Sequence, residues 1–188
     1  MGLNNKYGDM EFKKYDFLEE EYLSSVESID SIIDAQYTTL WGEAGEARNW
    51  ELYKFLFHPE ARLIRYEEDW VDGVIKAKFM TVDDYINGIG NWLETKRETG
   101  FYENEAARRE NVFSNIAHVF STYQSFNTKK EMEANTPYSR GICSFQLLFH
   151  EDRWWIIDLY WTRETLENPI PDEFLGKSHR ILRTSKTG

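Results

Sequence analysis

The sequence predicts an α+β domain in which three helices precede a set of long antiparallel strands. Apolar residues recur every three or four positions in three segments between residues 24 and 100, which is typical of helices buried along one face. From residue 101 to residue 161 the apolar residues alternate with a period of two, which is typical of strands. This order favours helices gathered on one face of an antiparallel sheet.

Local signals place the three helices. Ser24 and Glu27 have the spacing of a capping box, Asn49 is a suitable N-cap, and Thr81 with Asp84 forms a second capping box. Gly42 ends the first helix, and the dipeptide His58-Pro59 ends the second, because a residue before proline disfavours helical geometry. Three helices are predicted in this way, over residues 24–41, 49–57 and 81–100.

The strands are predicted from alternation and from turn residues. Two short strands, 61–66 and 74–79, flank an acidic turn and form a hairpin. Two-residue turns are expected at Ser114-Asn115 and at Glu151-Asp152. The four long strands are 101–112, 116–126, 141–149 and 154–161.

The last hairpin is apolar on both faces, which predicts a second covering layer. One face carries Phe149, Trp154, Leu147, Ile156, Phe145 and Tyr160, and the other carries Leu148, Trp155, Ile157, Leu159, Ile142 and Trp161. An antiparallel sheet usually exposes polar residues on one side, and helices can cover only one face here. We therefore expect a homodimer formed through the outer face of the sheet.

Length and composition exclude several classes of protein. A chain of 188 residues with 41% hydrophobic and 16% aromatic residues is large enough for one domain with a sizeable core. A net charge of −11 repels nucleic acids and anionic membrane surfaces, so neither is an expected partner. No apolar run reaches the length of a signal peptide or membrane helix, which predicts a cytoplasmic protein. We divide the chain into an N-terminal lead-in (1–23), a domain (24–164) and a C-terminal tail (165–188).

The order of elements, with the runs NIAHVFSTYQSF, RGICSFQLLF and RWWIIDLYW, resembles the nuclear transport factor 2-like (SnoaL-like) superfamily. The resemblance spans Ser24 to Thr162. It implies a cone-shaped, curved antiparallel sheet wrapped around a long N-terminal helix, with two further helices and a pocket at the open end. Because this fold hosts isomerases, dehydratases, cyclases, hydrolases and binding modules, it does not fix the function.

The resemblance also implies a set of site residues. Ketosteroid isomerases of this superfamily use a tyrosine on the first helix and an aspartate at the end of the first strand. Tyr37 matches the tyrosine, but the base position falls on or beside Arg65, and arginine cannot abstract a proton at neutral pH. Of the histidines that a scytalone-type dehydratase would use, His118 is the one candidate.

The strand register that the resemblance implies gives the cavity-facing residues. The candidate catalytic pair is His118 and Tyr37, and Arg109 and Glu103 lie on the neighbouring strand, opposite Phe120 and Phe126. The alternative for His118 is a cross-strand hydrogen bond that fixes register, and the alternative for Tyr37 and Trp41 is core packing. The candidate ligand-binding residues are Trp41, Glu103, Arg109, Phe120, Thr122, Gln146 and Trp161.

Two functions are consistent with these residues. The first is a binding module, a homodimer whose aromatic pocket holds a small, partly apolar molecule such as an acid held by Arg109. The second is a cofactor-independent lyase or isomerase, with His118 as acid and base and Tyr37 as hydrogen-bond donor. The second requires both polar tips in one cavity. Since the chain has no GxGxxG, P-loop or HExxH motif, no cofactor and no metal are expected.

Overall fold

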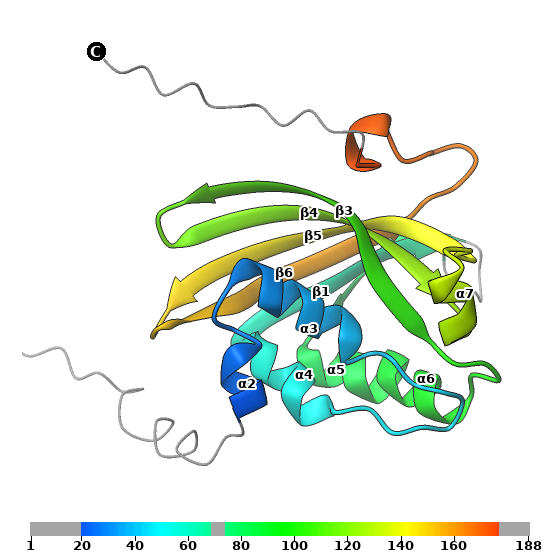
Figure 1. The fold of residues 1–188 in the computed structure, drawn as a ribbon, viewed down its shortest axis with the longest axis horizontal. Helices are drawn as coiled ribbons and strands as arrows, with labels where there is room; N and C mark the ends of the chain where they lie inside the picture. The colour runs from blue at the N-terminus through cyan, green and yellow to red at the C-terminus, as the bar shows by residue number, and fades with distance from the viewer. Residues whose placement is uncertain (1–19, 69–73, 177–188) are drawn as a thin grey trace, which may run out of the picture.

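The computed structural model describes residues 20–68 and 74–176, and it has the predicted α+β class. A curved sheet lies on one side, and the main helices lie together on its concave side (Figure 1). The helical elements are α2 (Glu20–Ser24), α3 (Ile29–Thr38), α4 (Trp50–Leu56), α5 (Val82–Tyr85), the π-helical turn η1 (Ile86–Gly90), α6 (Asn91–Thr95), α7 (Lys129–Glu133) and the 3-10 turn η2 (Asp172–Phe174).

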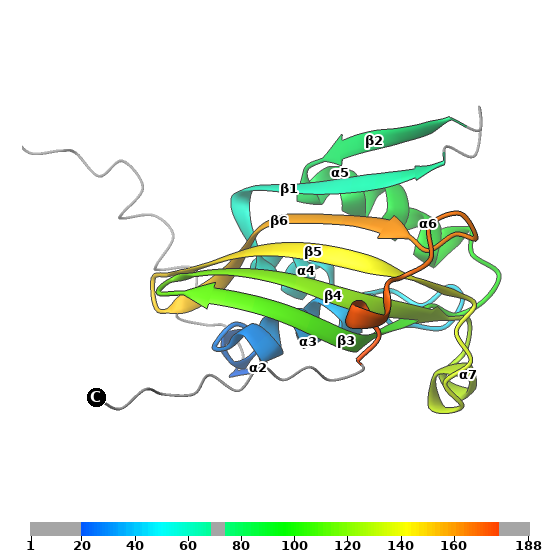
Figure 2. The same ribbon diagram turned by 90° about the horizontal axis from the view of Figure 1, so that it is seen from above.

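Six strands form one sheet in the order β2-β1-β6-β5-β4-β3 (Figure 2). Neighbouring strands are antiparallel, except for β1 and β6, which run parallel. The sheet begins with the predicted hairpin, but its first strand is longer at both ends than the predicted 61–66; the turn of this hairpin lies outside the described residues. The strands are β1 (Phe57–Glu68), β2 (Ile75–Met80), β3 (Tyr102–Phe113), β4 (Ile116–Phe126), β5 (Ser139–His150) and β6 (Arg153–Arg163).

The first predicted helix is broken and shorter than expected. The capping box lies at Ser28 and Ser31, each side chain accepting a hydrogen bond from the other's backbone N–H, and not at Ser24. The Val26 carbonyl accepts a hydrogen bond from the Trp154 N–H (2.9 Å), which holds the chain against β6 between α2 and α3. Because the Val26 carbonyl bonds to β6 and not to a helical N–H, the helix is interrupted at this point. The sheet curves around α3, the helix that follows (Figure 1).

The other two helices begin where the sequence predicts. Asn49 caps α4 by accepting a hydrogen bond from the Leu52 N–H, and Thr81 and Asp84 form the expected capping box of α5. The third helix continues through η1 into α6, so one turn of it has π geometry. Such a turn widens the helix locally and often occurs at functional sites.

A β-bulge at Ala106 changes the predicted pairing of β3 with β4. From the turn to Ala107 the register is the expected one, with Arg109 opposite Phe120. Ala106 is an extra residue in β3, and beyond it Glu103 lies opposite Ser125 instead of Phe126.

A second bulge at Ile157 corrects the predicted faces of the last hairpin. Phe149 faces Trp154 as expected, but Phe145 pairs with Leu159 because Ile157 has no partner in β5. Residues beyond the bulge therefore exchange faces, and Leu159 and Trp161 lie on the concave side.

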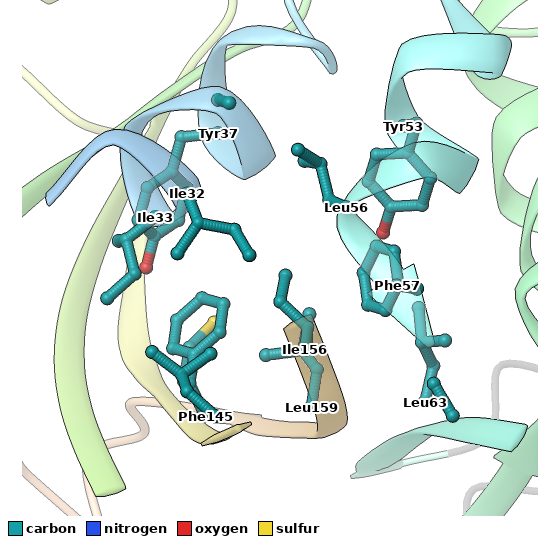
Figure 3. Close-up of a cluster of buried hydrophobic side chains, with 14 of the residues drawn as sticks. Ile32, Ile33, Tyr37, Tyr53, Leu56, Phe57, Leu63, Phe145, Ile156 and Leu159 are labelled. Carbon is teal, nitrogen blue, oxygen red and sulfur yellow. The ribbon is translucent and has the colours of Figure 1, made fainter. Parts of the chain in front are cut away.

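The core fills the space between the helices and the concave face of the sheet. Figure 3 shows Tyr37 of α3 above Phe145 of β5, with their ring centroids 6.3 Å apart. The fully or nearly fully buried side chains in this cluster include Ile32, Ile33, Tyr53, Leu56, Phe57, Leu63, Ile156 and Leu159. Within residues 20–68 and 74–176, no helix has both the length and the apolar character needed to cross a bilayer.

The chain after β6 returns across the outer face of the sheet, opposite the main helices (Figures 1 and 2). Phe174 packs on Phe120 with ring centroids 5.7 Å apart, and its carbonyl accepts a hydrogen bond from Thr122 Oγ1 (2.5 Å). Arg109 forms an ion pair with Glu173 (2.8 Å). Residues 165–176, which we call the C-terminal strap, thus cover the β3–β4 part of that face; the basic residues from 177 onwards lie outside the described residues.

Candidate functional site

A pocket of about 500 Å³ lies between the helices and the concave face of the sheet. Its size is within the range of small-molecule sites. The helices contribute Gln36, Leu40, Tyr53, Tyr85, Ile89, Trp92 and Leu93, and the sheet contributes Arg65, Lys78, Glu103, Tyr123, Ser125, Ser139, Cys143, Leu159, Trp161 and Arg163.

Two stacked tyrosines form the inner wall of this concave pocket. The rings of Tyr53 and Tyr85 have centroids 5.4 Å apart and an interplanar angle of 16°, and Trp161 contacts Tyr85 edge-on at 6.0 Å. Burial raises the pKa of both tyrosines above the usual value. Both hydroxyls therefore stay protonated near neutral pH and are available as hydrogen-bond donors.

Two buried polar atoms at the pocket make no well-formed hydrogen bond within the described residues, although the Gln36 and Tyr85 side chains are near enough to the Tyr53 hydroxyl to influence its pKa. They are Gln36 Oε1 and the Tyr53 hydroxyl, on side chains that are 3% and 0% exposed. A buried polar atom without a partner costs about 1–3 kcal/mol, and native proteins rarely leave one unsatisfied. Since both residues line the pocket, a polar group inside it can supply the missing hydrogen bonds.

Basic side chains are concentrated around the pocket. Arg65 of β1 and Lys78 of β2 are directly opposite each other in the sheet, and Arg163 stands at the end of β6. Lys96 and Arg97, next to the end of α6, complete a set of five cations. Among the described residues, Glu103 is the only carboxylate in the lining.

Arg97 is held in place as part of the pocket wall. Its guanidinium lies 5.4 Å from the Trp92 ring centroid and 5.3 Å from that of Phe101. Nη2 donates a hydrogen bond to Asn127 Oδ1 (2.8 Å), and Nε donates one to the Gly100 carbonyl (3.0 Å). These contacts fix its orientation beside the more exposed lysines.

Glu103 and Trp41, both predicted as ligand contacts, have different positions. The Glu103 carboxylate lines the pocket and accepts a hydrogen bond from Ser125 Oγ (2.7 Å). The Trp41 indole N–H donates to the Glu103 backbone carbonyl (2.6 Å), and Trp41 is not in the lining. Trp41 therefore holds the backbone of β3 at Glu103 and does not contact the pocket itself.

The π-helical turn places a glycine where it enlarges the pocket. Gly88 lies in the lining, and a Cβ at this position would meet no atom within 4 Å. Ile89, the next residue, lines the same wall. Gly88 thus leaves room that a larger side chain would occupy.

Tyr37 belongs to the core rather than to the pocket. Its hydroxyl lies 2.8 Å from Ser121 Oγ, both residues are buried, and burial raises the pKa of Tyr37 well above its usual value. Tyr37 does not line the concave pocket. The core-packing alternative for this residue agrees with the structure.

His118 lies on the outer face of the sheet, away from Tyr37. Its Nε2 is 2.8 Å from Ser144 Oγ on the adjacent strand, and its ring packs on Phe120 at 4.6 Å. The flanking residues Ala117 and Val119 point into the core. The expectation that His118 and Tyr37 share one cavity is therefore wrong, because they lie on opposite faces of the sheet.

Most of the other strand residues that were predicted to bind a ligand lie, like His118, on the outer face of the sheet. Phe120, Thr122 and Arg109 contact the C-terminal strap on the outer face, and Gln146, paired with His118, shares their side. Of the predicted strand residues, only Glu103 and Trp161 line the concave pocket. The prediction chose the wrong face because both alternating sets of residues in β4 contain apolar and polar side chains. The helix α3 packs on the set with the smaller side chains, Ala117, Val119 and Ser121.

An apolar groove of about 520 Å³ lies on the outer face beside the strap. Trp161 borders both this outer groove and the concave pocket. The groove is lined mainly by apolar side chains, Ile64, Tyr66, Ala77, Phe120, Ile142, Tyr160, Trp161 and Phe174.

Sequence reasoning missed the basic residues of the pocket and its two unsatisfied polar atoms. One signal was present, because Arg65 occupies the position at which the resemblance places a catalytic base. Within the described ranges, no group of three His, Cys, Asp or Glu side chains is arranged to hold a metal ion.

No protein-family model and no curated protein matches the sequence. Among solved structures, a nuclear transport factor 2-like protein of unknown function from Silicibacter pomeroyi has 12% identity over 72% of this chain and 92% of that chain (TM-score 0.47). A Nostoc punctiforme protein with a cystatin-like fold has 14% identity over 63% and 78% (TM-score 0.46). A nuclear transport factor 2-like protein from Methylobacillus flagellatus has 16% identity over 73% and 95% (TM-score 0.42). The solved structures to which this chain is similar are thus described as nuclear transport factor 2-like or cystatin-like proteins.

Proposed function

We propose that the protein binds a small, partly apolar molecule in the concave pocket. The observation that carries this proposal is the pair of buried, unsatisfied atoms, Gln36 Oε1 and the Tyr53 hydroxyl, in a pocket walled by aromatic rings. Apolar walls with a few converging polar groups are typical of ligand sites. Arg109, which the sequence suggested as the anchor of an acid, is paired with Glu173 on the other face and takes no part.

A neutral fluorescent probe, N-phenyl-1-naphthylamine, tests this function. We expect saturable binding with one site per chain, measured by fluorescence titration. The variant Gly88→Leu adds a side chain at a lining position where a Cβ meets no atom outside the helix backbone within 4 Å, and it should abolish binding by filling the pocket. The matched control is Ala77→Arg, which places a bulky charge in the outer groove and should leave binding unchanged.

The opposite pattern would contradict the proposal. If Ala77→Arg removes probe binding and Gly88→Leu does not, the outer groove is the binding site. If neither this probe nor a charged counterpart binds in a saturable way, the concave pocket does not have the proposed function.

We further propose a homodimer through the part of the outer face that the strap leaves open. Exposed apolar side chains gather there on β1, β2 and β6, including Tyr66, Tyr160 and Phe79, which is 69% exposed. Together with the outer groove they form an apolar area of the kind that usually marks an interface. The strap already covers the β3–β4 part, so the second copy would pack on the other strands.

Light scattering after size exclusion tests the dimer. At micromolar concentration we expect twice the chain mass of 22.4 kDa, and Tyr160→Arg should shift the mass to that of a monomer. Phe113→Ser, which changes an exposed aromatic residue at the tip of the β3–β4 hairpin, is the control and should keep the dimer. A monomeric wild-type protein under these conditions would refute the dimer and leave the pocket proposal standing.

A cofactor-independent lyase or isomerase is the second candidate, favoured by the Glu103 carboxylate in the pocket wall. It would use Glu103 as the base and the protonated Tyr53 or Tyr85 as hydrogen-bond donor, because His118 and Tyr37 are excluded by their positions. If the protein turns over a ligand identified from the pocket, Glu103→Gln should remove turnover and retain binding. Turnover that survives this substitution would rule out Glu103 as the base.

A further inference from the structure

We infer that the ligand of the concave pocket is an amphipathic organic anion. Its charged head would lie at the basic mouth, formed by the exposed side chains of Lys78, Lys96 and Arg163, and an uncharged polar group would lie at the inner end, beside Gln36 and Tyr53. This inference rests on the proposed function and names the class of molecule bound. Three features carry it: the position of the cations, the lack of a described acidic partner for Lys78, Lys96 and Arg163, and the unsatisfied atoms deep in the pocket.

The cations form one row across three adjacent strands. Lys78 of β2 is opposite Arg65 of β1, and Arg65 is in turn opposite Trp161 of β6. Arg163 follows two residues after Trp161 and therefore points to the same side. An anionic group in the pocket can accept charge-assisted hydrogen bonds from these side chains.

Acidic partners are missing for three of the five cations, within the residues that the structure describes. Lys78, Lys96 and Arg163 form no ion pair with any described residue, although the whole chain has a net charge of −11. Hydrogen bonds from Thr81 are the main cause of the lowered pKa of Asp84, and the Lys78 charge adds a smaller effect. Basic side chains thus outnumber acidic ones in the pocket lining, whereas acidic residues outnumber basic ones in the chain as a whole.

The inner end of the pocket requires a different chemistry. The basic side chains of Lys78, Lys96 and Arg163 are exposed, whereas Gln36 and Tyr53 are buried. Gln36 Oε1 can only accept a hydrogen bond, and the protonated Tyr53 hydroxyl can donate one. A hydroxyl group, which both donates and accepts, matches the two atoms, and the aromatic wall between them and the mouth matches an apolar body.

A pair of probes that differ only in charge tests the inference. 8-Anilinonaphthalene-1-sulfonate carries one sulfonate that N-phenyl-1-naphthylamine lacks, and the sulfonate stands for the anionic head. We expect the anionic probe to bind roughly tenfold or more tightly at low salt, because charge-assisted hydrogen bonds form at the mouth. Added salt should weaken the anionic probe and leave the neutral one unchanged.

Variants of the mouth separate this inference from the proposed function. Lys78→Gln and Arg163→Gln alter exposed side chains, so the fold should be kept, and the double variant should bring the two affinities close to equal. Lys54→Gln is the matched control, since Lys54 pairs with Asp83 outside the pocket, and it should preserve the difference.

Each outcome decides between the two claims. Equal affinity of the two probes in the wild-type protein, with both blocked by Gly88→Leu, would overturn the anion and leave small-molecule binding intact. A preference for the anionic probe that survives the double variant would likewise overturn the role of these cations. Absence of saturable binding for both probes would instead reject the proposed function.

Discussion

At the scale of single residues, the hydroxyl of Tyr37 stabilises the core. It lies 2.8 Å from Ser121 Oγ between α3 and β4, and neither side chain has access to solvent or to the concave pocket. The pair satisfies two polar atoms in an apolar cluster, which is the usual reason for a buried tyrosine–serine contact.

We predict that Tyr37→Phe lowers the free energy of unfolding by about 1 kcal/mol, because Ser121 loses its buried partner. Urea denaturation followed by circular dichroism measures this change, and binding of the neutral probe should be unchanged. Ser121→Ala and the double variant complete a cycle in which the coupling is about 1 kcal/mol. Lost probe binding with unchanged stability would place Tyr37 in the site after all.

At the scale of elements, two bulges determine which side chains reach the concave pocket. The extra residue Ala106 shifts Glu103 relative to β4, and the extra residue Ile157 turns Leu159 and Trp161 towards the helices. A shift of one residue in a strand exchanges the two faces, so each bulge alters every residue beyond it.

The C-terminal strap is held to the sheet mainly through Phe174 and Glu173, which lie in the η2 turn. We predict that Phe174→Ser releases residues 171–176, because the ring contact with Phe120 is lost. Hydrogen exchange measured by mass spectrometry should then become faster in this segment, while exchange in β4 and β5 stays slow.

Leu166→Ser is the matched control for the strap, since Leu166 lies in the same segment and is 97% exposed. Its exchange pattern should equal that of the wild-type protein. If Phe174→Ser leaves exchange in residues 171–176 unchanged, the ring contact does not hold the strap.

At the scale of the whole molecule, burial of three tyrosines makes stability depend on alkaline pH. Burial raises the pKa values of Tyr37, Tyr53 and Tyr85 above the usual value. Above about pH 10 these tyrosines ionise in the unfolded chain and stay protonated in the folded one, so the unfolded state binds fewer protons. Their contribution to stability is therefore complete below pH 10 and declines as the pH rises further.

We predict a loss of about 1.4 kcal/mol per pH unit for each of these tyrosines above pH 10. Urea denaturation between neutral pH and about pH 11 measures the slope. Tyr85→Phe should make the slope shallower, because one of the three buried hydroxyls is removed. Equal slopes for the wild-type protein and Tyr85→Phe would contradict the assignment.

The sequence predicted most of the architecture because local signals agree with the tertiary structure. The caps at Asn49 and Thr81 gave the starts of α4 and α5, and the two-residue turns and the alternation gave the four long strands to within about two residues at each end. The predicted bounds of the first helix, 24–41, were wrong, since α3 spans Ile29–Thr38. Its start could not be predicted because the contact of Val26 with β6 and the cap at Ser28 cannot be recognised from spacing alone.

The concave pocket was only partly predictable. Glu103 and Trp161 were named, whereas His118, Phe120, Thr122 and Gln146 were assigned to the wrong face of the sheet. Both alternating sets of β4 contain apolar and polar residues, so hydrophobicity could not choose the face. Gln36 and Tyr53 were overlooked because an unsatisfied polar atom is a property of the packed structure.

The class of fold, the order of the elements and the strand pairings near the turns follow from the amino-acid sequence, since these depend on neighbours along the chain. The tertiary structure alone decided which residues meet in the concave pocket, because bulges, helix contacts and the returning strap act between distant segments. The meeting of Arg65, Lys78 and Arg163 from three separate strands is the clearest case, and it is the basis for proposing an anionic ligand.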